Sequence, residues 1–142
     1  MKGRFGLSMK TRLINSKEYI FCAWRKRFVR LTPEEYVRQR FLERLVTDYG
    51  YPREQIAVEV PLMDKRADAI VYDIHLKPLM IIEFKAETVP LTQKTLDQAA
   101  VYNRQVQVPY LILHNGPTTL AAHITTEITF LNTIPQWIEL SN

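Results

Sequence analysis

Two short apolar runs, joined by a link of turn length, set the strongest limit on the fold of this chain. Ala69–Tyr72 and Leu79–Ile82 are each of strand length and rich in Ile and Val. The link between them, 73–78, is long enough for a hairpin loop, and Pro78 stands where a strand tolerates proline, at its first residue. The sequence therefore predicts an antiparallel hairpin of two largely buried strands.

Polar residues stand at the open end of this predicted hairpin. Asp68 precedes the first run, and Glu83 and Lys85 follow the second, with Phe84 between them. Because side chains alternate across a strand, Glu83 and Lys85 share one face while Phe84 points to the other. If the strands are antiparallel neighbours, Asp68 and Glu83 lie close enough for both carboxylates to hold one hard cation, with Lys85 beside it.

These residues also carry a resemblance to a known family. Asp68, then Glu83-Phe84-Lys85, then Gln98 and Tyr102 resemble the PD-(D/E)XK nuclease superfamily, with Ala67 in place of the proline that names the motif. More narrowly, 31–39 (LTPEEYVRQ) followed by 49–52 (YGYP) is similar to the N-terminal nuclease domain of type I restriction enzyme R subunits, over roughly 21–115. The resemblance implies an α/β fold of the restriction-endonuclease-like class, with a central mixed β-sheet flanked by α-helices. We expect one such domain over 1–142.

The resemblance further implies a metal-dependent deoxyribonuclease and a role for each site residue. Asp68, Glu83 and the backbone carbonyl of Phe84 would bind Mg²⁺ or Mn²⁺, with Glu35 as a further candidate ligand. Lys85 would orient the attacking water or offset charge on the phosphate. Gln98 completes the expected catalytic set by helping to place the substrate. The expected substrate-positioning residues are Tyr102, Arg38, Lys65 and Arg66.

Each of these residues has a structural interpretation as well. Glu35 can stabilise a helix N-terminus through the helix dipole, and Glu83 with Lys85 can form an ordinary surface pair of small energetic value. Gln98 can be a solvent-exposed glutamine, and Lys65 can be a plain loop charge. At the level of the whole chain, the alternatives to a nuclease are a non-cleaving nucleic-acid-binding module and a partner-docking module of the same fold.

The flanking segments predict two helices and several strands. Thr32 followed by Pro33 and Glu35 is typical of a helix start, and Gly50 of its end. The other expected elements are a strand over 56–60 that Pro61 ends or bulges, with Glu59 facing outward; a turn at 64–66; a helix from Thr92 or Thr95 to about Arg104; a buried strand over 108–113; short strands or a last helix over 118–140; and short edge strands at Thr11–Ile14 and Tyr19–Trp24.

Charge is divided unevenly along the chain. Residues 1–44 carry twelve of the nineteen Lys and Arg against four acids, whereas 45–142 are net negative. A basic end suits a polyanion such as DNA, with the cluster Arg25-Lys26-Arg27 at the phosphates. The same cluster is equally typical of a solvated turn before a helix.

Composition narrows the class of protein further. Cys22 is the only cysteine, which excludes an internal disulfide and a multi-cysteine metal site. No apolar run approaches the ~20 residues that a membrane-spanning helix needs, so we expect a cytoplasmic protein with no membrane partner. The sequence contains no translocase motor of the kind that follows this domain in R subunits. The expected partners are DNA, a motor or other restriction-system subunit, and a second copy of the chain.

Overall fold

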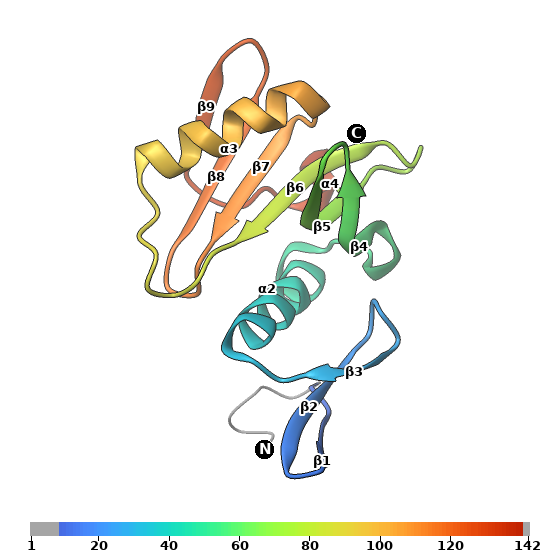
Figure 1. Cartoon of the computed structure of the whole chain (residues 1–142). Helices are drawn as coiled ribbons and strands as arrows, with labels where there is room; N and C mark the ends of the chain where they lie inside the picture. The colour runs from blue at the N-terminus through green and yellow to red at the C-terminus, as the bar shows by residue number, and fades with distance from the viewer. Residues whose placement is uncertain (1–8, 141–142) are drawn as a thin grey trace.

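The computed structural model of the chain describes residues 9–140 and arranges them as two sheets and the helices packed on them (Figure 1). The elements, in chain order, are β1 (Thr11–Ile14), β2 (Lys17–Cys22), β3 (Arg27–Arg30), α2 (Pro33–Tyr49), the 3₁₀ turn η1 (Arg53–Gln55), β4 (Ile56–Leu62), β5 (Lys65–Tyr72), β6 (Pro78–Phe84), α3 (Gln93–Val106), β7 (Tyr110–His114), β8 (Thr119–Ile124), β9 (Ile128–Leu131) and α4 (Trp137–Leu140). Within residues 9–140, no helix is both long and apolar enough to cross a membrane.

The larger sheet has the strand order β4-β5-β6-β7-β8-β9. Its neighbours pair antiparallel except β6 and β7, which run parallel from Met80 opposite Tyr110 to Phe84 opposite His114. Parallel neighbours need a crossover, and α3 supplies it (Figure 1). The predicted mixed sheet and central hairpin are therefore confirmed, and the expected helix after Thr92 is the one that connects the two parallel strands.

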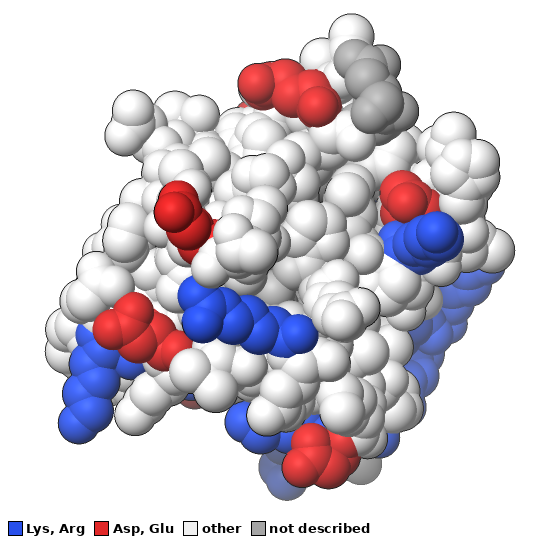
Figure 2. Space-filling model, turned by 90° about the horizontal axis from the view of Figure 1, so that it is seen from above, with Lys and Arg blue, Asp and Glu red and all other residues white. Residues whose placement is uncertain are grey.

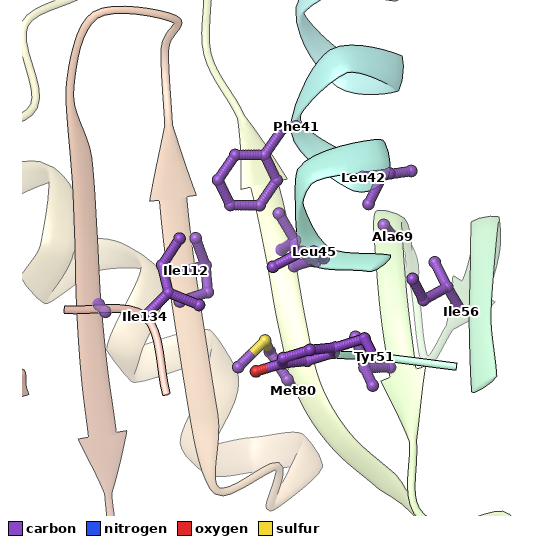
Figure 3. Packing of buried hydrophobic residues seen from close by; sticks show 12 residues of the cluster. Phe41, Leu42, Leu45, Tyr51, Ile56, Ala69, Met80, Ile112 and Ile134 are labelled. Carbon is purple, nitrogen blue, oxygen red and sulfur yellow. The ribbon is translucent and has the colours of Figure 1, made fainter. Parts of the chain in front are cut away.

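Each face of this sheet carries a hydrophobic cluster under one helix. On one face, α2 places Phe41 and Leu45 against Ile112 of the sheet (Figure 3). On the other face, α3 contributes Leu96 and Ala100. All five side chains are at most 2% exposed, and burying a large apolar side chain contributes about 1.5–3 kcal/mol. The sheet is thus the middle layer, held from both sides.

The ends of α2 follow the expected signals. The hydroxyl of Thr32 accepts the Glu35 amide at 3.1 Å, and Pro33 opens the helix. At the other end Gly50 has φ 77 and donates its amide to the Leu45 carbonyl, so a residue without a side chain takes the left-handed position. Of the two predicted N-caps of α3, Thr92 is the one used: the helix starts at Gln93 and runs to Val106, slightly past the expected end.

The β4–β5 hairpin departs from prediction in three places. Pro61 does not end β4, which continues to Leu62. Lys65 and Arg66, expected in the turn, already belong to β5 and pair with β4. Glu59 has φ 53, a left-handed conformation that interrupts the regular strand within β4. The sequence does not predict this left-handed conformation, because glutamate is not a residue type that favours a positive φ.

The first three strands form a separate antiparallel sheet of order β1-β2-β3. The two predicted strands are present as β1 and β2, with β2 at Lys17–Cys22 and not at Tyr19–Trp24, whereas β3 was not predicted. None of the three is an edge of the larger sheet; they lie beyond α2 from it (Figure 1). Ile20 and Cys22 of β2 are fully buried, and the Trp24 indole donates to the Arg53 carbonyl at 3.1 Å. The small sheet is therefore fastened to the segment between α2 and β4.

The uneven charge of the sequence is also uneven in space. Residues 9–44, which carry ten of the nineteen Lys and Arg, form β1–β3 and most of α2, at the lower end of Figure 1. Seen from above, the opposite end is mostly uncharged, with acidic and basic groups scattered over it (Figure 2). Positive charge is thus concentrated at the end that carries α2 and the small sheet.

Candidate active site

Strands β5 and β6 stop pairing at the position of Asp68. Their antiparallel register ends with Ala69 opposite Ile82. Beyond that pair, Oδ2 of Asp68 accepts a hydrogen bond from the Phe84 amide at 2.8 Å. A side-chain carboxylate thus takes the place of the backbone carbonyl that a continued ladder would supply.

This hydrogen bond sets the directions in which the Phe84 amide, carbonyl and side chain point. In a strand, the amide and carbonyl of one residue point to the same neighbouring strand, so the Phe84 carbonyl points toward β5, as its amide does. The Phe84 ring turns to the α2 face and packs edge-on against Phe41, with ring centroids 5.7 Å apart. The Asp68 carboxylate and the Phe84 carbonyl therefore lie on the same side of β6.

Glu83 and Lys85 share a face, as the alternation predicts. Nζ of Lys85 lies 2.6 Å from Oε2 of Glu83, and both side chains are about one-third exposed. The Lys85 amide donates to the His114 carbonyl at 2.9 Å, which extends the pairing with β7 one residue past β6. The backbone of Lys85 is thereby fixed, while its ammonium and the Glu83 carboxylate remain open to water.

The protonation of Asp68 depends on several neighbours. Burial raises the pKa of Asp68 above its usual value, and the charge of Glu83 acts in the same direction. The Phe84 amide and the charges of Arg38 and Lys85 oppose this rise without cancelling it. Glu83 and Lys85 are therefore near enough to Asp68 for all three charges to influence one another.

Arg38 connects α2 to the strand that carries Asp68. Its Nη1 donates to the Asp68 carbonyl at 3.3 Å, and its Nη2 donates to Oε1 of Glu35 at 3.0 Å. Glu35 is buried, and its Oε2 also accepts from Gln39 at 3.0 Å and from Arg25. The Glu35 side chain therefore does not cap the helix backbone; it faces inward and binds three side chains.

Glu59 joins these side chains, and we call Arg25, Glu35, Arg38 and Glu59 the arginine–glutamate cluster. Oε1 of Glu59 lies 3.4 Å from Arg38 and 3.8 Å from Arg25. Burial disfavours the charged form of Glu35, but the bonds from Arg25 and Gln39 and the charge of Arg38 outweigh it, so the pKa of Glu35 is lowered. Arg25 was predicted to contact phosphate or to lie in a solvated turn, and the structure instead turns it inward.

The two predicted residues of α3, Tyr102 and Gln98, differ in their surroundings. Tyr102 donates its hydroxyl to the Leu62 carbonyl, and its ring lies 4.7 Å from Nζ of Lys65. Gln98 is exposed, one helical turn before Tyr102. Since α3 starts beyond the end of β6 and runs back across the sheet, Gln98 lies nearer than Tyr102 to that end. Arg66 donates to the Glu59 carbonyl at 3.1 Å.

The donor set at the end of β6 fits a small hard cation better than a soft one. Among residues 9–140 no three His, Cys, Asp or Glu side chains gather closely enough to hold a metal by themselves. The two carboxylates of Asp68 and Glu83 with the Phe84 carbonyl are an all-oxygen set, and Mg²⁺ is commonly bound by one or two carboxylates while it keeps several waters. Glu35 is a poor candidate ligand, because three side chains already occupy its oxygens.

Sequence reasoning missed the inward position of Arg25, the role of Glu59 and the burial of His114. The spacing of Glu35 and Arg38 is that of a helical ion pair, so this half of the cluster was open to prediction. Arg25 and Glu59 come from other segments, and no local pattern joins them. His114 is buried because it packs against Phe41, with ring centroids 4.3 Å apart.

Comparison with known protein families assigns this chain to one of them. A sequence profile described as type I restriction enzyme R protein N terminus (HSDR_N) matches residues 33–135, most of the chain. The chain belongs to this family. The matched residues include α2, β5, the Glu83–Lys85 pair and α3, the parts of the chain that carry the candidate site.

A solved structure shares the fold of this R-protein N-terminal domain. It is a fragment of an HsdR subunit of a type I restriction enzyme from Vibrio vulnificus YJ016, with a TM-score of 0.60 and 21% sequence identity. The similarity covers 77% of this chain and 24% of that one, so the domain corresponds to about a quarter of the fragment. No curated protein matches the chain.

Proposed function

We propose that this R-protein N-terminal domain is a metal-dependent endonuclease of the PD-(D/E)XK type, which hydrolyses DNA phosphodiesters within a type I restriction system. The observation that carries the proposal is the hydrogen bond from the Phe84 amide to the Asp68 carboxylate. It brings the Asp68 side chain to the end of β6, beside Glu83 and Lys85. Membership of the R-protein family supports the proposal, since restriction enzymes act on DNA.

Asp68, Glu83 and the Phe84 carbonyl are the residues that would hold Mg²⁺ or Mn²⁺. When bound there, such an ion polarises a phosphoryl oxygen and lowers the pKa of a coordinated water. Only ionised carboxylates bind the cation well, and the pKa of Asp68 is raised. We therefore expect metal affinity to increase with pH over the acidic range in which Asp68 loses its proton.

Lys85 would supply positive charge to the phosphate under attack. Its ammonium lies 2.6 Å from Oε2 of Glu83. At this place it would donate to water or to a phosphate oxygen, where a fixed positive charge offsets charge that develops during hydrolysis. The backbone bond from Lys85 to His114 holds the residue in position.

The other predicted residues would hold the substrate or the site. Gln98 is exposed on the α3 side and is free to contact the DNA strand, with Tyr102 supporting the hairpin tip through Leu62. Arg38 acts as a positioning residue, since it holds the Asp68 carbonyl rather than substrate. Lys65 and Arg66 lie at the start of β5 with exposed side chains, where they can contact phosphates without reading sequence.

The test is cleavage of plasmid, linear duplex and single-stranded DNA by the purified chain with Mg²⁺ or Mn²⁺. We expect Glu83→Gln and Lys85→Ala each to abolish cutting. Glu127→Gln and Lys77→Ala are the matched controls: both residues are exposed, Lys77 lies in the loop at the other end of the β5–β6 hairpin, and both variants should cut like the parent chain. Unfolding by urea should be similar for all four variants, which separates a lost site from a lost fold.

Two results would contradict the proposal. Cutting that persists in both Glu83→Gln and Lys85→Ala would place the activity elsewhere, in a contaminant or a second site. Binding of DNA without any cutting, unchanged by these substitutions, would instead favour a recognition module that depends on another subunit of the restriction system.

A further inference from the structure

The small sheet of β1–β3 has two faces of opposite character. Paired residues of neighbouring strands point to the same face, and successive residues of one strand alternate. On one face, Ile20 and Cys22 of β2 are at most 1% exposed. The sulfur of Cys22 accepts from Arg25, which bonds to Glu35 of α2, so this face is the one packed toward α2. The opposite face points away from α2 and from the larger sheet (Figure 1).

We call this opposite side the outer face, and it combines aromatic rings with cations. Its side chains are those that alternate with the buried ones: Lys10, Arg12, Ile14, Lys17, Tyr19, Phe21, Phe28 and Arg30. The only acid of residues 9–32, Glu18, pairs with Leu13 on the face toward α2. All four cations are exposed, and within residues 9–140 none of them takes part in an ion pair. The outer face is thus positive without a compensating acid among the described residues.

Aromatic rings hold two of these cations in place. Tyr19 lies opposite Arg12 of β1 and opposite Arg30 of β3, so the three residues form one row across the sheet. The guanidinium carbon of Arg30 lies 5.7 Å from the centroid of the Tyr19 ring. That of Arg12 lies 4.1 Å from the centroid of the Phe28 ring, and contacts of this length are cation–π interactions. A guanidinium held on a ring loses fewer conformations on binding, and the N–H groups at its edge stay available to an acceptor.

We propose that the outer face binds the phosphate backbone of duplex DNA. Each exposed cation can neutralise one phosphate, and the guanidinium groups of Arg12 and Arg30 match phosphate oxygens with pairs of hydrogen bonds. The aromatic rings are partly buried and position the arginines rather than stack on bases, so we expect no preference for sequence. The assignment of DNA as the partner rests on the function proposed above, since positive charge alone also suits other polyanions.

The outer face is separate from the residues that the proposed nuclease uses. Strand β3 ends at Arg30, before the first residue of the family match, 33. Helix α2 lies between the small sheet and the larger sheet, whose strand β6 carries Glu83 at the candidate active site (Figure 1). The outer face would therefore hold a stretch of DNA other than the one that is cut. Its loss should weaken binding without changing the cleavage chemistry.

The experiment measures how salt weakens the binding of a short duplex to the whole chain. Fluorescence anisotropy of a labelled duplex is followed in EDTA, so that binding is measured without cutting. Each phosphate contact contributes about −0.9 to the slope of log affinity against log salt, so the four cations together contribute about −3.6. This contribution alone weakens binding about 100-fold when the salt concentration rises fourfold. A duplex of unrelated sequence should bind equally well.

Single substitutions locate the phosphate contacts. Arg12→Ala and Arg30→Ala should each reduce the slope by about 0.9, whereas Arg12→Lys keeps the charge and should retain it. Lys17→Ala, at the exposed start of β2, should give the same reduction while both arginines stay on their rings. The matched control is Arg27→Ala: Arg27 is an exposed arginine of β3 but pairs with Cys22 on the other face, so the slope should not change. Urea unfolding of each variant separates a lost contact from a lost fold.

Each result decides one point. Absence of duplex binding overturns the proposal, as does a slope that Arg12→Ala, Lys17→Ala and Arg30→Ala leave unchanged. Vesicles containing phosphatidylserine are the second probe, and Arg12-dependent binding to them that is tighter than binding to the duplex would assign the outer face to an anionic membrane surface instead. Glu83→Gln should abolish cutting and keep the slope. An Arg12-dependent slope in a chain that never cuts would retain the outer face as a DNA contact and refute the nuclease.

Discussion

The arginine–glutamate cluster predicts a large loss of folding stability when the carboxylate of Glu35 is removed. Glu35→Ala removes a group that is 6% exposed and leaves Arg25 and Arg38, with side chains 13% and 15% exposed, facing each other without it. Removing one partner of a buried ion pair costs about 3–5 kcal/mol, and the slight exposure of both arginines places the expected loss near about 3 kcal/mol. The free energy of unfolding of an ordinary domain is about 5–15 kcal/mol, so the variant should still fold.

Urea unfolding followed by circular dichroism at neutral pH measures this loss. Glu34→Ala is the matched control, because Glu34 is the preceding residue of the same first turn but is exposed; its loss should stay below about 1 kcal/mol, the value of a charge at a helix N-terminus. Because the pKa of Glu35 is lowered on folding, its stabilisation is present above the unfolded value of about 4.3 and is lost as pH falls below it. Equal losses for the two variants at neutral pH would refute the argument.

Three further predictions use the same unfolding assay. Asp68→Ala leaves the Phe84 amide without its acceptor and should cost about 1–3 kcal/mol, whereas Asp68→Asn keeps an acceptor oxygen and should cost less; equal costs would mean that the bond is dispensable. Gly50→Ala forces a side chain into φ 77 with no atom to clash against, so the loss should be about 1 kcal/mol, and no loss would contradict the left-handed geometry. The pKa of His114 falls to about 4 on folding, so the unfolded chain takes up that proton first and stability should drop as pH falls from about 6.5 toward 4. His114→Gln should flatten this slope, and an unchanged slope would assign it to other groups.

The sequence predicted most of the larger sheet because its signals are local. Thr32, Pro33 and Gly50 delimit α2 by capping chemistry that acts within one turn. The central hairpin follows from two apolar runs and a proline at the start of the second, Pro78. The prediction that Glu83 and Lys85 share one face of the strand while Phe84 points to the other is also confirmed, since it depends only on the period of a strand.

What the sequence did not predict depends on contacts between distant segments. Arg25 lies in a basic run that is typical of solvent, and it turns inward because Glu35 and Glu59 are presented by two other elements. The side chain of Asp68 replaces a backbone acceptor only where two strands separate, and the point of separation is set by tertiary packing. The strand signals of β1 and β2 likewise do not specify a partner, and β3 was not predicted.

The single parallel pairing in the larger sheet has a consequence for how the domain is assembled. Strands β4-β5-β6 and β7-β8-β9 are two meanders whose contacts are close in sequence, whereas joining β6 to β7 requires the whole α3 segment to close as a loop. Contacts that close long loops form slowly, so this seam is expected to be the late step of folding. The backbone of Lys85 is fixed by its bond to His114 across the seam. A chain emerging from the ribosome would therefore form the bond between Asp68 and Phe84 early and fix the backbone of Lys85 last.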